Sequence, residues 1–171
     1  MIQILRKLSI CKYLYLGDAG VAGIGVFAAK PFVAGTVIVC DEDGDYYDEI
    51  FSRSELIERR IDIERFAFQI AVDSFILPNG NIDDFINHSC RPNAGIRLTG
   101  KGYKLISIED INKDDQICYD YSTYMFDNNE QFKCHCRSNN CRGHINSFYT
   151  LDVDLREKYI ASRVVAPQFL K

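Results

Sequence analysis

The 171-residue sequence lacks the features that mark membrane and secreted proteins. No apolar run approaches the roughly 20 residues that a membrane-spanning helix needs. Segment 1–7 lacks the pattern of a secretory signal, because its apolar run is short and no small-residue cleavage site follows its basic residues. We therefore expect an intracellular protein, nuclear or cytoplasmic, with no membrane partner.

An excess of positive charge is also missing. Lys and Arg number 20 against 24 Asp and Glu, which gives a formal net charge of −4. Proteins that bind nucleic acid through its phosphates need a basic face, so we expect no direct nucleic-acid binding. A basic protein or peptide is a better match for this charge, although mild acidity can serve solubility alone. The sequence does not indicate an oligomeric state.

Repeats, low-complexity linkers and a regular alternation of strands with helices are absent as well. Short β-rich segments predominate instead. They are 8–16, 36–39, 66–70, 94–98, 103–108 and 116–121. The spacing of Ser52 and Glu55 predicts a capping box at the start of a short helix, and Asp154 with Glu157 predicts a second helix near the C-terminal end. The predicted fold class is α+β, mainly β.

A glycine-rich turn spans residues 17–25 and includes part of a dinucleotide fingerprint, Gly23-x-Gly25-x-x-Ala28. In dinucleotide-binding folds this motif opens a helix. Here Pro31 follows after a few residues and a β-rich segment comes next, so the context excludes that interpretation. The glycines predict a turn, which can also let backbone approach a ligand.

The central segment combines an apolar approach with four hydrogen-bonding side chains. It is Phe85-Ile86-Asn87-His88-Ser89-Cys90-Arg91-Pro92-Asn93. Pro92 prevents continuation as a helix or a central strand. The crowding of polar side chains predicts a pocket wall. A turn in which Asn87 and Ser89 bond their own backbone fits this segment equally well when it is taken alone.

Three of the seven cysteines lie within eight residues of one another. They are Cys134, Cys136 and Cys141. This spacing is typical of a tetrahedral zinc site with thiolate ligands. The fourth ligand comes from Cys90, His135 or His144, and we favour Cys90 because a distant ligand would tie this segment to the central one. One structural zinc ion is predicted, against the alternative of free thiols or a disulfide.

Four motifs follow one another along the chain: the glycine turn, the central segment, a Tyr-Asp-Tyr triplet and the cysteines. The triplet is Tyr119-Asp120-Tyr121. From about Ile10 to Gly143 the chain resembles the SET-domain protein lysine methyltransferases with a post-SET cysteine tail. The resemblance implies a SET fold of small curved β-sheets with a pseudoknot and a zinc-bound C-terminal tail. It also implies a SET domain over 1–126, followed by the post-SET tail and a helical segment over 127–171.

The resemblance further implies S-adenosylmethionine as the cofactor and methyl transfer to a lysine side-chain amine in a basic protein, such as a histone tail. The residues implied to contact the cofactor are Gly23, Ile24, Gly25, Asn87, His88, Tyr121 and Phe132. In the family the tail's zinc is completed by the cysteine of the central motif, which matches Cys90. The catalytic residues implied are Tyr121, which orients the amine and the methyl group, and Tyr119, whose hydroxyl predicts mono- or dimethylation.

The sequence departs from the family pattern at three positions. Asp84 replaces a usual arginine, Gln116 a usual second carboxylate and Ile24 a frequent aromatic residue. A rival hypothesis is a catalytically silent module of the same fold that binds basic peptides through the acidic residues at 41–45. Tyr121 favours the enzyme.

Overall fold

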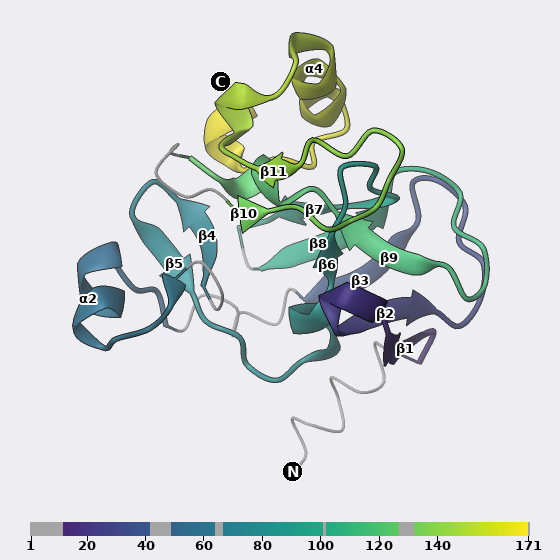
Figure 1. Cartoon of the computed structure of the whole chain (residues 1–171), viewed down its shortest axis with the longest axis horizontal. Coiled ribbons are helices and arrows are strands. Elements are labelled where there is room, and N and C mark those ends of the chain that lie inside the picture. Colours follow the sequence, from purple (N-terminus) through teal and green to yellow (C-terminus); the bar gives the residue numbers. More distant parts are fainter. Residues whose placement is uncertain (1–11, 42–48, 64–66, 101, 127–131, 171) are drawn as a thin grey trace.

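The structure, a computed structural model, describes residues 12–41, 49–63, 67–100, 102–126 and 132–170. Short strands and 3-10 turns dominate these residues, with two short α-helices, one at the left and one at the top of Figure 1. Neither helix is long and apolar enough to cross a bilayer, a statement that covers the described residues alone. The predicted α+β, mainly β class is confirmed.

The first sheet has four strands in the order β1-β2-β9-β6. Their bounds are β1 Leu14–Asp18, β2 Ile24–Ala28, β9 Gln116–Tyr119 and β6 Asn87–His88. β1 pairs with β2 and β2 with β9 in antiparallel fashion, whereas β6 and β9 are parallel. That pairing sets His88 opposite Tyr119, so the central segment meets the Tyr-Asp-Tyr triplet. The pseudoknot threading itself stays an expectation from the family.

The first strand differs from its predicted bounds. Residues 8–11 of that prediction lie outside the described residues, and β1 runs on through Gly17, where we expected a turn. Gly17 pairs with Gly25 of β2, and a Cβ at Gly17 would lie 3.0 Å from the Phe27 ring. Strand pairing and this tight packing therefore extend β1 into the glycine-rich segment, and the turn contracts to the 3-10 helix η1, Gly20–Ala22.

The second sheet has the order β3-β8-β7. The strands are β3 Val37–Asp41, β8 Tyr103–Ser107 and β7 Ala94–Leu98, so the predicted hairpin is confirmed. The Asn93 side chain links this sheet to the first. Its Nδ2 donates to the Gln116 carbonyl at 2.8 Å, and its Oδ1 accepts from the Cys118 amide at 3.0 Å. The main core lies between these strands and includes Val26, Leu105 and Ile117, which are fully buried.

Residues 49–63 and 67–78 form a small unit that we call the insert, on the left of Figure 1. It contains α2 Arg53–Glu58, β4 Phe68–Ala71 and β5 Ser74–Ile76, around a cluster of Phe51, Leu56 and Phe75. The predicted capping box is confirmed: the Ser52 amide donates to Glu55 Oε2 at 2.7 Å and the Glu55 amide to Ser52 Oγ at 3.3 Å.

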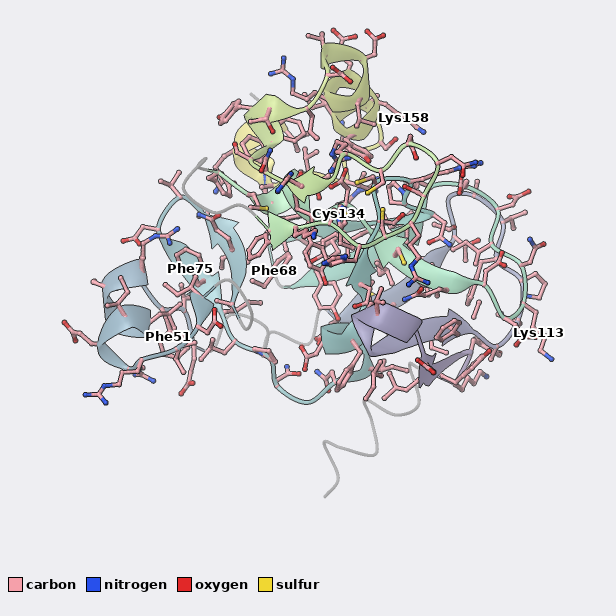
Figure 2. All side chains as sticks on the ribbon, viewed as in Figure 1. Phe51, Phe68, Phe75, Lys113, Cys134 and Lys158 are labelled. Atoms are coloured by element: carbon pink, nitrogen blue, oxygen red, sulfur yellow. The ribbon has the colours of Figure 1, made fainter. Side chains whose placement is uncertain are left out.

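The alternation predicted over 66–70 holds only in part. Phe66 lies outside the described residues, and Gln69, expected on the outer face, is 7% exposed. Gln69 is buried because its amide is satisfied inside: Nε2 donates to the Val72 carbonyl at 3.0 Å and Oε1 accepts from the Phe126 amide at 3.3 Å. In Figure 2, Phe51 and Phe75 lie within the insert, whereas Phe68 lies nearer the main body.

The C-terminal part begins with the paired strands β10 Phe132–Lys133 and β11 His144–Ile145. The 3-10 helix η5 Phe148–Thr150, the helix α4 Val153–Ala161 and the 3-10 helix η6 Pro167–Leu170 follow. The prediction that Asp154 caps α4 is wrong. Asp152 is the N-cap, because the chain is still extended there and Val153 already starts the first turn.

This C-terminal part packs directly on β7. Gly95 permits close approach, since a Cβ at that position would lie 2.5 Å from Cβ of Val164. The guanidinium of Arg97 donates to the carbonyls of Ser162 at 2.8 Å and Arg163 at 3.2 Å, just beyond the end of α4. Tyr159 and Val164 belong to the main core, so the C-terminal part is built into it.

Candidate active site and metal centre

Two cavities are lined by neighbouring residues of the same segments. The first, about 180 Å³, is lined by Ile86, Tyr119 and Tyr121 among others, and we call it the aromatic cavity. The second, about 330 Å³, is lined by residues that include Asn87 and Cys118, and we call it the polar cavity. Tyr119 of β9 lines the aromatic cavity, whereas the preceding Cys118 lines the polar cavity, so β9 borders both.

The aromatic cavity lies between the insert, β9 and the 3-10 helix η4, Tyr121–Tyr124. The rings of Tyr119 and Tyr121 are 4.8 Å apart between centroids, and those of Phe68 and Tyr124 are 4.9 Å apart. The cavity therefore offers a narrow slot with aromatic walls. Such walls suit an alkyl chain, and a cation can also bind over the faces of the rings.

Tyr121 has a fixed orientation in this cavity. Its hydroxyl donates to the Ile86 carbonyl at 2.9 Å. Burial, with a smaller contribution from Cys118, raises the pKa of Tyr121 well above its ordinary value of 10. The phenol therefore stays protonated at neutral pH, where it acts as a hydrogen-bonding group rather than as a base.

Two carboxylates stand at one side of the aromatic cavity, in the 3-10 helix η3, Ile82–Phe85. Asp83 accepts a hydrogen bond from the Tyr103 hydroxyl. Asp84, which replaces the family's usual arginine, accepts from the backbone amides of residues 79–81 at 2.7 to 3.1 Å. Burial and the neighbouring Asp83 raise the pKa of Asp84, and these amide bonds oppose that rise. A basic substrate would meet acidic side chains here.

The polar cavity brings the turn before β2 to the central segment. Asn87 and Gln116 line it, together with Ala19, Val21 and Ala22 of the turn. Among the predicted cofactor residues, Asn87 and His88 line this cavity, whereas Gly23, Ile24 and Gly25 are not among its lining residues.

The structure shows how these glycine-turn residues support the wall. Asn87 Nδ2 donates to the Ile24 carbonyl at 2.9 Å. A Cβ at Gly25 would lie 2.5 Å from Gln116 Nε2 and 3.0 Å from Asn87 Nδ2. Gly23 adopts φ +77°, a left-handed conformation that favours glycine.

Arg91, His135 and Arg137 line the polar cavity. From the sequence, the two arginines have no predicted site role, and His135 is considered only as a zinc ligand. Their only signal is position, since each lies next to a cysteine of the predicted zinc site. Phe132, predicted to cover the adenine, lines the aromatic cavity.

The predicted metal ligands come together beside the polar cavity, near the labelled Cys134 in Figure 2. Potential ligand atoms of His88, Cys90, Cys134 and Cys136 all lie within 4.8 Å of one another. The sulfurs of Cys90 and Cys134 are 3.7 Å apart. Zn–S bonds of about 2.3 Å give a tetrahedron with edges of roughly 3.8 Å, so this spacing suits zinc.

Cys141 lies at the edge of the sulfur cluster. Burial, followed by the neighbouring thiols that include Cys141 and Cys90, raises the pKa of Cys134. Cys141 is not part of the tighter group that contains His88. The alternative ligands His135 and His144 are also outside that group, which was sought among the described residues.

His88 bridges the sulfur cluster and the tyrosine motif. Its Nδ1 accepts a hydrogen bond from the Tyr121 amide at 3.2 Å, which assigns the proton to Nε2. Nε2 lies 3.3 Å from the Cys90 sulfur. Burial lowers the pKa of His88 to about 4, so the ring is neutral at pH 7. His88 can thus donate to a metal-bound thiolate and stay in place, as outer partners of metal ligands do.

The fold and these sites define a SET domain. The SET-domain family model matches residues 23–122, more than half of the chain, and the chain belongs to that family. The resemblance noted in the sequence is therefore confirmed.

Curated relatives share this region. The chain is 29% identical to "Probable histone-lysine N-methyltransferase set-23" of Caenorhabditis elegans, across 72% of this chain and 55% of that protein. It is 30% identical to "Histone-lysine N-methyltransferase SETD1B" of Homo sapiens, across 82% of this chain and 7% of that protein. The chain thus spans about half of the first relative and a small part of the second.

Solved structures show the same fold. The methyltransferase domain of human SETMAR matches with a TM-score of 0.59 and 22% identity, over 78% of this chain and 58% of that one. KRYPTONITE, solved in complex with mCHG DNA and SAH, matches with a TM-score of 0.59 and 23% identity, over 77% of this chain and 28% of that one. The SET fold expected from the sequence is confirmed.

Proposed function

We propose that this chain transfers a methyl group from S-adenosylmethionine to the side-chain amine of a lysine in a basic protein. The observation that carries the proposal is the pair of cavities that β9 borders. A lysine chain fits the aromatic cavity and a polar cofactor the other. The curated relatives, which are named histone-lysine N-methyltransferases, support the same reaction and a histone tail as one candidate substrate.

The residues of the aromatic cavity account for the chemistry on the amine. S-adenosylmethionine supplies an electrophilic methyl group on a positively charged sulfur. A free lysine has a pKa of about 10.4, so the amine must lose its proton before it can attack. The aromatic walls at Tyr119 and Phe68 favour the neutral amine by desolvation. The Tyr121 hydroxyl and the Ile86 carbonyl would orient it for in-line transfer.

The remaining site assignments follow from the same proposal. Gly23, Ile24, Gly25, Asn87 and His88 would hold the cofactor beside the polar cavity, and Tyr121 and Phe132 would contact it from the aromatic cavity, which they line. One zinc ion would be held by Cys90, Cys134, Cys136 and Cys141, with His88 donating to the Cys90 sulfur. With four protein ligands this zinc has no open position for water, so its role is structural.

The proposal is tested with the purified chain, S-adenosylmethionine carrying a labelled methyl group, and a panel of histones and other basic proteins. We expect label on lysine, and Tyr121→Phe should reduce turnover by about 100-fold, as loss of one catalytic hydrogen-bonding group often does. Tyr149→Phe, at a tyrosine that is 60% exposed, is the matched control and should keep full turnover. Calorimetry with S-adenosylhomocysteine checks that Tyr121→Phe still binds the cofactor product.

Full turnover by Tyr121→Phe would contradict the catalytic role. Absence of transfer by the wild-type chain, with basic peptides still bound, would favour the silent module. The acidic segment invoked for that rival lies outside the described residues, apart from Asp41, which is buried. Mass spectra should show mono- and dimethyl-lysine, because Tyr119 lines the cavity and its hydroxyl would limit the room around the amine. A mainly trimethylated product would contradict that assignment.

A further inference from the structure

Asp120, between the two tyrosines of the motif, carries a carboxylate that neither cavity uses. Its residue is 1% exposed. Arg142, which directly follows Cys141, binds it through both arms of the guanidinium: Nη1 to Oδ2 at 2.8 Å and Nη2 to Oδ1 at 2.7 Å. Such paired, charge-assisted bonds fix the direction of the carboxylate as well as its position.

Residues of several other elements also contact the Asp120 carboxylate. The Tyr159 hydroxyl of α4 donates to Oδ2 at 3.0 Å, and the Ser122 amide donates to Oδ1 at 3.1 Å. His88 Nδ1 lies 3.5 Å from Oδ1 without donating to it, because the proton of this neutral ring is on Nε2. The central segment, the cysteine tail, α4 and η4 therefore meet at one buried side chain.

Asp120 is also the N-cap of η4, whose first residue is Tyr121. Besides the side-chain bond to Ser122, its carbonyl accepts from the Thr123 amide at 3.0 Å. The direction of the Asp120 carboxylate thus sets where η4 begins. Since Tyr121 is the first residue of that turn, the position of its ring depends on this cap.

Arg142 reaches the sulfur cluster as well. Its backbone amide lies 3.4 Å from the Cys90 sulfur, while its guanidinium holds Asp120. His88 closes a ring of contacts, because it bonds the Tyr121 amide on one side and faces the Cys90 sulfur on the other. The seating of the cysteine tail and the placement of the tyrosines are thereby linked through short, direct contacts.

We propose that Arg142 is a positioning residue for Tyr121. When the cysteine tail is docked, Arg142 holds Asp120, the N-cap of η4. The catalytic phenol is therefore in place only in the docked state. This inference rests on the proposed methyl transfer, in which Tyr121 orients the amine. A lysine cannot replace Arg142, because an ammonium lacks the planar pair of donors that the two Asp120 oxygens require.

The test compares Arg142→Ala and Arg142→Lys with Lys158→Ala, which removes an exposed cation from α4. A misplacement of the phenol by about 1 Å predicts a fall in kcat of about 100-fold for both Arg142 variants. The KM for peptide and the zinc content should stay close to wild type, and Lys158→Ala should leave kcat unchanged. Millimolar guanidinium ion should raise the kcat of Arg142→Ala at least about tenfold. The Arg142 side chain is 25% exposed, so its removal leaves an accessible space that fits the ion.

A fall in kcat that follows zinc loss and does not respond to guanidinium would overturn the positioning role. Should Arg142→Ala not fold, the double variant Asp120→Asn with Arg142→Gln replaces the ion pair by a neutral one. It should bind one zinc and turn over slowly, and wild-type kcat in that variant would also overturn the proposal.

Amide hydrogen exchange of Tyr121 separates this inference from the proposed function. Its amide bonds His88, and it should exchange faster in Arg142→Ala than in Lys158→Ala. Suppose the wild-type chain methylates no protein of the panel, yet this difference in exchange appears. The proposed methyl transfer is then wrong, and the positioning role of Arg142 stands. If the chain methylates lysine and the exchange is unchanged, the positioning role is wrong.

Discussion

The insert and the cysteine tail border the same aromatic cavity, yet different interactions hold them. The insert relies on an apolar cluster of Phe51, Leu56 and Phe75 and on the helix cap at Ser52. The tail, residues 132–145, is held by closely spaced sulfurs and by the ion pair of Arg142 with the buried Asp120. Apolar packing is non-directional and tolerates small shifts, whereas charge-assisted bonds and metal ligands fix geometry.

The difference predicts distinct roles for the insert and the cysteine tail around the aromatic cavity. The tail is fixed to the strands that carry the tyrosines, so it suits the reaction, which needs exact placement of atoms. The insert is packed mainly through apolar side chains, with a hydrogen bond from the Phe126 amide to Gln69 Oε1, so it suits contact with a peptide chain of variable sequence. Changes in the tail should therefore affect turnover, and changes in the insert should affect substrate affinity.

The largest effect is expected from Cys90→Ser, which removes the sulfur shared by the tail and the central segment. Structural zinc contributes about 10 kcal/mol or more in small zinc domains, so its loss should detach the tail and reduce methyl transfer at least about 100-fold. Metal analysis and turnover are measured on the same sample. Cys40→Ser, in β3, is the control and should keep zinc. Full zinc content in Cys90→Ser would remove the main distinction between the two regions.

A smaller and different effect is expected from Phe75→Ala in the insert. Phe75 is 1% exposed, and truncation of a buried phenylalanine typically costs about 3–5 kcal/mol. Because its cluster is separate from the main core, the cost should fall on the insert: KM for peptide rises while zinc content and cofactor binding are unchanged. Steady-state kinetics and calorimetry measure these quantities. Val72→Ala, at a residue that is 67% exposed, should change neither.

The smallest effect is expected from Ser52→Ala, which removes the capping box of α2. Loss of such a cap costs about 1 kcal/mol, which lowers Tm by roughly 2–4 °C in a chain of this size. Thermal unfolding measures it, with Glu58→Gln at the exposed end of the same helix as the control. An unchanged Tm would show that the insert unfolds separately from the main body and sharpen the contrast with the tail.

Sequence patterns correctly predicted the elements that are determined by interactions between residues close in the sequence. The hairpin of β7 and β8 and the capping box of α2 were correct, because alternation and cap spacing act within a few residues. The motif order was enough to identify the family, which the family match over residues 23–122 confirms. The division into 1–126 and 127–171 stays a prediction, and the main core draws residues from both parts.

Long-range contacts could not be predicted in the same way. Nothing in the spacing shows that Arg142 faces Asp120, because the two residues meet only after the tail has docked. The burial of Gln69 depends on Phe126, which lies 57 positions away. For α4, choosing between Asp152 and Asp154 as the cap required the direction of the chain that enters the helix.

The parallel pairing of β6 with β9 also constrains how the protein folds. The β7–β8 hairpin lies between these strands in the sequence, and it can form early because its partners are close along the chain. β6 and β9 can meet only after that intervening stretch has collapsed, since closing a longer loop costs more chain entropy. Both cavities depend on this late pairing, so a folding intermediate that contains the hairpin alone would bind neither lysine nor cofactor.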